Sequence, residues 1–195
     1  MNNIPGYTFG TPAVAKSPVT DEEFSLLKAT VFFSDQDVEA LRLAARVLDG
    51  KAEQILDVWY GYVGANPHLL TYFSGKDGKP DAAYLSAVRA RFAQWIRDTT
   101  SANFDRDWLD YQYEVGLRHT RGKKNRTDAV ASQADVIHLR YLIAFIYPLT
   151  ATIKPFLALE GNTPEEIDRM YNAWFKAVTL TAVLWSQPYV TDGSF

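Results

Sequence analysis

The chain has 195 residues, of which 47% are hydrophobic, enough to bury a substantial core within one domain spanning residues 1–195. Its formal net charge is only −3, with both signs interspersed, so it lacks the one-signed charge expected of a protein that binds nucleic acid or anionic lipid. It contains no cysteine, which excludes disulfides, thiolate nucleophiles, iron–sulfur clusters and cysteine-ligated metals.

Residues 1–19 predict an extended N-terminal arm, because Pro5-Gly6, Gly10 and Ser17-Pro18 do not continue a helix. Three side-chain caps then indicate helix starts: Thr20 with Glu23, Ser34 with Asp37, and Thr163 with Glu166. Apolar residues recur every three to four positions after these caps. The predicted helices span residues 20–29, 35–49, 51–65, 81–100, 105–121, 136–157 and 164–186, which predicts an all-α fold.

No stretch of about 18 apolar residues is present, so no membrane span is predicted. The N-terminus also lacks the basic start and apolar run of an export signal, and we expect a cytoplasmic protein. The segment 122–128 is polar and basic, and it is predicted to be a solvated loop.

Two late helical segments carry apolar or aromatic residues on more than one face, Tyr141–Leu157 and Tyr171–Trp185. Such helices are buried on two sides. One hypothesis is a homodimer joined through these two helices. The alternative, equally compatible with the pattern, is a central helix pair in a monomer.

His119 is the strongest candidate for chemistry, because it lies in a helix-patterned stretch where an imidazole can face a buried cofactor and hold a haem iron. A second interpretation places it near a helix end, where it contacts terminal carbonyls. Aromatic and apolar residues at helical spacing accompany it: Trp59, Tyr60, Val88, Phe92, Phe145 and Leu149. They suit a flat apolar ligand, although such stripes also form ordinary core.

The remaining histidines fit local roles better than metal binding. His68 follows Pro67 at a helix junction, and His138 stands beside Arg140 at a helix start, where it is expected to be exposed. Neither has a ligand-forming partner four residues away, so a non-haem metal site is not predicted.

Long runs of the chain resemble the protoglobin family. They include Ile4–Tyr7, Ile55–Gly61, His68–Leu70, Val88–Phe92, Trp108–His119, Tyr141–Pro148, Ile153–Leu157 and Met170–Lys176. The resemblance implies a globin-like fold, a three-over-three helical sandwich with an extra N-terminal segment and helix. It also implies a b-type haem with His119 as the proximal ligand, Trp59 and Tyr60 on the distal side, and Phe92 and Phe145 in the haem pocket.

On this resemblance, Val88 occupies the position where many globins keep a distal histidine, and it can neither ligate nor donate. Tyr60 is then the best distal donor, since its phenol can hydrogen-bond dioxygen. Trp59 is expected to act as a bulky gate, with its indole N–H as a second donor.

Two features depart from the family. Thr120 follows His119 where a second histidine is common, and the segment Ala131–His138 is divergent. The arm, with Tyr7 and Phe9, is expected to fold over the haem edge and bury the propionates, with Arg89 and Arg91 as candidate propionate partners. A solvated position for both arginines is the alternative.

The resemblance therefore implies a haem protein that reversibly binds dioxygen, carbon monoxide and nitric oxide at a five-coordinate iron, for storage or sensing. A haem enzyme or engineered biocatalyst is the competing class, since an open iron also serves peroxide, nitrite, carbene or nitrene chemistry. A structural domain whose aromatic residues are only core is a third.

Overall fold

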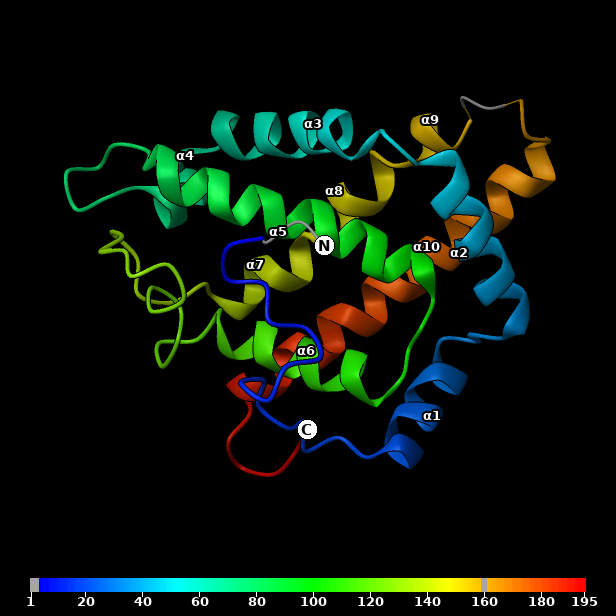
Figure 1. Cartoon of the computed structure of the whole chain (residues 1–195), viewed down its shortest axis with the longest axis horizontal. Coiled ribbons are helices and arrows are strands. Elements are labelled where there is room, and N and C mark those ends of the chain that lie inside the picture. Colours follow the sequence, from blue (N-terminus) through cyan, green and yellow to red (C-terminus); the bar gives the residue numbers. More distant parts are fainter. Residues whose placement is uncertain (1–3, 159–160) are drawn as a thin grey trace.

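The structure, a computed structural model, describes residues 4–158 and 161–195, so residues 1–3 of the arm lie outside it. Within these ranges the regular structure is helical, with only isolated bridges pairing Ser74 with Pro80 and Gly75 with Ser132. The helices are α1 (Asp21–Thr30), α2 (Asp35–Val47), α3 (Ala52–Ala65), α4 (Pro67–Leu70), α5 (Ala82–Ser101), α6 (Arg106–Leu117), α7 (Leu139–Ala144), α8 (Ile146–Ala151), α9 (Lys154–Leu157) and α10 (Pro164–Ser186), with 3₁₀ turns η1 (Thr71–Phe73) and η2 (Gln187–Tyr189). The all-α prediction is confirmed (Figure 1).

The predicted caps start three of these helices. Thr20 and Thr163 each accept the backbone N–H three residues ahead, and Glu23 and Glu166 accept the N–H of the capping threonine in return. At α2 the carboxylate of Asp37 accepts the backbone N–H of Ser34 at 2.7 Å. These bonds satisfy donors that a helix start otherwise leaves free.

The predicted continuous helix 136–157 is wrong. It is broken into α7, α8 and α9, and both breaks are explained by proline. α7 ends at Ala144, four residues before Pro148, and α8 ends at Ala151, four residues before Pro155. Proline has no N–H to donate to that carbonyl, and its ring clashes with it.

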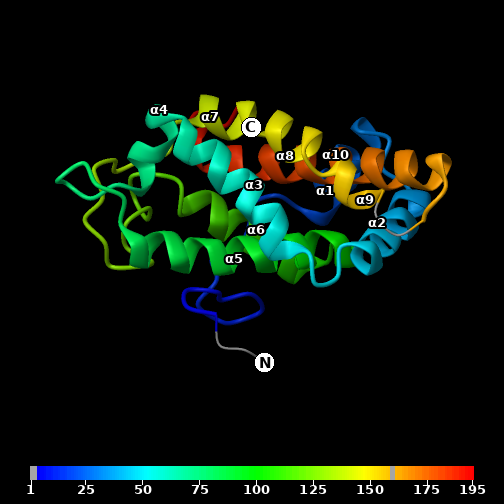
Figure 2. The ribbon, with the colours of Figure 1, turned by 90° about the horizontal axis from the view of Figure 1, so that it is seen from above.

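Helix α10 is the centre of the packing: it contacts α2, α6, α7, α8 and α9. Trp174 of α10 and Trp59 of α3 are both fully buried, and their rings pack against each other. Figure 2 shows α3 crossing above α5 while α7 and α8 lie beside α10. Among the described residues, no helix is both long and apolar enough to cross a membrane.

The described part of the arm, residues 4–19, has no helix, as predicted. Its first part lies outside α5, on the side away from α7 and α8, and the chain then runs inward toward α1 (Figure 2). Side-chain hydrogen bonds hold it there: Tyr7 donates to Asp98 of α5 at 2.8 Å, and Asp110 of α6 accepts the backbone N–H of Ser17 at 2.9 Å. These hydrogen bonds attach the arm to α5 and α6.

Gly116 lets α6 approach the end of α10. A Cβ at this position would lie 3.1 Å from the Cα and the carbonyl oxygen of Trp185 and 3.1 Å from Pro188. We expect Gly116→Ala to lower the free energy of unfolding by about 1 kcal/mol, because overpacking costs about 1–3 kcal/mol and outweighs the gain of about 1 kcal/mol in helix propensity. Urea denaturation measures the change.

Gly61→Ala is the matched control. Gly61 is also helical, but a Cβ there meets nothing within 4 Å, so alanine is expected to stabilise the protein. Equal stabilities of the two variants would contradict the close approach at Gly116.

Candidate functional site

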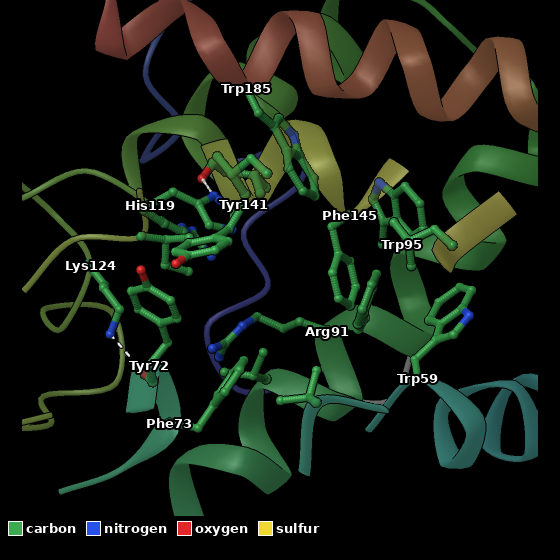
Figure 3. A pocket seen from close by; sticks show the side chains of 18 of the residues that line it. Trp59, Tyr72, Phe73, Arg91, Trp95, His119, Lys124, Tyr141, Phe145 and Trp185 are labelled. Carbon is green, nitrogen blue, oxygen red and sulfur yellow. Dashed lines mark hydrogen bonds between the residues drawn. The ribbon is translucent and has the colours of Figure 1, made fainter. Parts of the chain in front are cut away.

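A largely apolar cavity of about 240 Å³ lies between the helices. The seven residues proposed from the sequence to surround a haem all line it: Trp59, Tyr60, Val88, Phe92, His119, Phe145 and Leu149. Figure 3 shows His119, Lys124 and Tyr72 toward one end and Trp59 and Trp95 toward the other. Residues from distant parts of the chain therefore meet at one place.

The predicted helix 105–121 ends early, and this positions His119. Helix α6 stops at Leu117, and the backbone N–H of His119 turns back to the carbonyl of Gly116 at 3.0 Å. In a continued helix that N–H would bond the carbonyl of Val115. The Val115 carbonyl is instead 2.7 Å from Nδ1 of the imidazole.

This contact defines the chemical state of the ring. A carbonyl only accepts, so Nδ1 carries the proton, and in a neutral imidazole Nε2 keeps its lone pair. Burial is the main cause that lowers the pKa of His119 to about 4; the charges of Lys124 and Arg118 add to this effect, and the Val115 bond opposes it. The ring is therefore neutral at pH 7. Among the described residues, Nε2 has no hydrogen-bond partner.

Trp185 of α10 supports the imidazole. The two rings stack with centroids 5.0 Å apart and planes at 28°. The indole N–H of Trp185 donates to Oε1 of Gln112 at 2.9 Å, and Gln112 is fully buried on α6. Neither residue was predicted from the sequence, since each acts through a partner that is distant in the chain.

Tyr60 presents an unsatisfied hydroxyl. Its Oη is buried and has no hydrogen-bond partner among the described residues. Burial raises the pKa of Tyr60, and the charges of Arg89 and Arg91 offset only part of that rise, so the phenol keeps its proton. A buried hydroxyl without a hydrogen-bond partner lowers the stability of the protein by about 1–3 kcal/mol. A ligand that accepts a hydrogen bond from this hydroxyl would offset that cost.

Trp59 does not have the free donor that was predicted. Its indole N–H donates to Oγ1 of Thr152 at 2.7 Å, and that hydroxyl in turn donates to the carbonyl of Pro148. The side chain is 1% exposed and packs against Phe92, with ring centroids 4.9 Å apart. Its bulk lines the cavity, but the prediction of a second distal donor is wrong.

The two candidate arginines differ in position, since Arg91 lines the cavity and Arg89 does not. Arg89 bonds Glu53 and Asp57 of α3 and does not line the cavity. Arg91 does line it, and makes two bonds to Asp128, at 2.8 and 2.7 Å, and one to the carbonyl of Pro5 in the arm. The arm therefore meets the cavity wall at its charged side, whereas a contact of either arginine with a propionate stays a prediction.

Lys124 contradicts the prediction that segment 122–128 is solvated, since it is 4% exposed and lines the cavity. Burial lowers its pKa to about 8, against the opposing charges of Asp135 and Asp128. Its ammonium is tolerated because oxygen acceptors surround it: the carbonyls of Tyr72 and Ala134, Oδ1 of Asn125 and Oγ of Ser132. Nothing in the local polar pattern could have located these acceptors.

His68 and His138 are exposed, as expected for His138. His138 Nδ1 lies 2.7 Å from the phenol oxygen of Tyr72. Among the described residues, no cluster of three or more histidine, cysteine, aspartate or glutamate side chains could hold a metal ion. His119 is thus the strongest candidate ligand, and it would act alone.

Comparison with known proteins gives one family. A family model described as Protoglobin matches residues 20–195, nearly the whole chain. No curated protein matches the sequence. The family match agrees with the resemblance seen in the sequence and with a globin-like arrangement of the helices.

Proposed function

The chain belongs to the protoglobin family of haem-binding globins, and we propose that it reversibly binds dioxygen, carbon monoxide and nitric oxide at a five-coordinate b-type haem. His119 carries the proposal: its imidazole is neutral, it is fixed through Nδ1, and Nε2 is left as a ligand. When bound, the haem would supply an iron that can bind a diatomic gas.

The cavity fits a flat, mostly apolar group with a charged edge. Its walls include the apolar side chains of Val88, Phe92, Phe145 and Leu149, while Arg91 and Lys124 contribute cations. This division suits a porphyrin whose ring is apolar and whose propionates are anionic.

Tyr60 is proposed as the donor to the gas. Its phenol is protonated, buried and without another partner among the described residues. Val88 lines the same cavity without a polar atom, so it excludes water from the site without competing for the ligand. We therefore assign selectivity for dioxygen to Tyr60.

The proximal assignment is tested with the absorption spectrum of ferrous, haem-loaded protein with and without carbon monoxide. The wild type is expected to show the Soret band of a histidine-ligated carbonyl adduct, because Nε2 of His119 keeps its lone pair and has no hydrogen-bond partner among the described residues. His119→Ala should lose or shift that band. Identical spectra would overturn the assignment of His119, and a wild type that binds no haem would overturn the proposed function.

The distal assignment is tested by Tyr60→Phe. Loss of a hydrogen bond worth about 1 kcal/mol predicts dioxygen dissociation about fivefold faster. Tyr62→Phe is the control, since Tyr62 lies on the same helix but is 45% exposed. Stopped-flow measurement of dioxygen release compares the three proteins, and an unchanged rate in Tyr60→Phe would remove the donor role.

We also propose a homodimer formed through α7, α8 and α10. These neighbouring helices expose large apolar side chains: Ile143, Tyr147 and Phe175 are 52%, 78% and 46% exposed. Tyr147→Asp is expected to shift the protein to monomer in sedimentation velocity, because a charge cannot be buried unpaired in an interface. Leu26→Asp, an exposed residue of α1, should leave the dimer intact. A wild type that is only monomeric at tens of micromolar would refute this arrangement.

A further inference from the structure

A tyrosine and a histidine connect the cavity to the surface. Tyr72 of η1 lines the cavity and is 5% exposed, and its phenol oxygen lies 2.7 Å from Nδ1 of His138. His138 immediately precedes α7 and is exposed. A single hydrogen bond thus joins the cavity wall to a base in contact with solvent.

The direction of this bond follows from its two groups. Burial raises the pKa of Tyr72, so its phenol holds a proton at pH 7. No other acceptor contacts that phenol among the described residues, whereas a neutral imidazole offers one lone pair. The phenol therefore donates to Nδ1, and the protonated Nε2 is the nitrogen left for solvent.

Backbone hydrogen bonds hold both Tyr72 and the segment that carries His138 in place. Lys124 donates to the backbone carbonyl of Tyr72 at 3.1 Å (Figure 3). The N–H of Ile137, the residue before His138, donates to the carbonyl of His119 at 2.9 Å, and Tyr189 donates to the carbonyl of Ile137. The segment that carries His119 also positions the base.

Other tyrosines of the cavity lack such a base. Tyr141 also lines the cavity, with its ring centroid 5.9 Å from that of Tyr72, but no hydrogen bond joins its hydroxyl to a histidine among the described residues. The hydroxyl of Tyr60 has no hydrogen-bond partner among the described residues. A phenol that loses an electron becomes a strong acid, so oxidation is favoured where a base already accepts its proton.

We propose that Tyr72 and His138 form a proton-coupled redox relay, which carries oxidising equivalents from a peroxide reduced in the cavity to a phenolic electron donor in solution. The relay rests on the proposed function, because a bound haem would supply the chemistry that reduces the peroxide.

Each one-electron step is balanced. Tyr72 gives one electron to the oxidant in the cavity and its phenolic proton to Nδ1 of His138, which leaves a neutral tyrosyl radical and an imidazolium. A phenol at the surface then supplies one electron, His138 returns its proton to Tyr72, and the proton of the donor enters water. Two cycles deliver two electrons, and the two protons from the donors complete the reduction of one hydrogen peroxide to two waters.

The test uses haem-loaded protein whose Soret band has first been recorded. Wild type is mixed with hydrogen peroxide, freeze-quenched and examined by electron paramagnetic resonance. We expect a tyrosyl radical whose spectrum narrows when the tyrosine rings are deuterated. The signal should be lost in Tyr72→Phe and in His138→Leu, and it should persist in Tyr141→Phe.

His138→Leu changes an exposed side chain, so it decides the outcome even if Tyr72→Phe loses its fold. Oxidation of a soluble phenol should fall in parallel with the radical. A normal Soret band with a radical that keeps its wild-type yield in either Tyr72→Phe or His138→Leu would overturn the relay. A wild type without a Soret band would instead overturn the haem-binding function, so the two failures are distinguishable.

Discussion

The hydrogen bond from Nδ1 of His119 to the carbonyl of Val115 is the interaction on which the site depends. It exists because α6 ends two residues before His119, which frees that carbonyl from its helical partner. The released groups are not left unsatisfied: the Leu117 carbonyl accepts the hydroxyl and the N–H of Thr120, and the His119 carbonyl accepts from Ile137 and Tyr189. The end of the helix is thus a defined structure that gives the imidazole its tautomer and its orientation.

The same site depends on a close approach between two helices. Because Gly116 has no side chain, the end of α10 can lie against α6, and Trp185 then stacks on His119. Gln112, one turn earlier on α6, accepts the indole N–H of Trp185 and fixes its orientation. Helix α6 and the turn directly after it therefore supply the histidine, the space for its neighbour Trp185 and the acceptor that orients that neighbour, which limits the motion of the imidazole.

Features determined by local chemistry could be predicted from the sequence. The capping boxes at Thr20 and Thr163 involve residues three apart, so their pattern is visible in the chain itself. The breaks near Pro148 and Pro155 were equally local, and the helical periodicity across them was misleading because it continues through the interruption. The family resemblance identified some of the residues that line the cavity: Trp59, Tyr60, Val88, Phe92, His119 and Phe145. Long-range contacts were not visible: Trp59 meets Thr152, 93 residues away, and Lys124 meets the carbonyl of Tyr72, 52 residues away.

The tyrosines of the cavity show how one side chain acquires different chemistry from its surroundings. Tyr60 and Tyr72 are both kept protonated by burial, and both line the same space. Tyr60 has no acceptor among the described residues, so its proton is available to a ligand but has no route away from the cavity. Tyr72 already donates to His138, so it has little to offer a ligand, but it can release its proton when it loses an electron. A phenol that donates a hydrogen bond to a gas must have no other acceptor, whereas a phenol that is oxidised needs an acceptor for its proton. The cavity provides both environments, and a tyrosine occupies each of them.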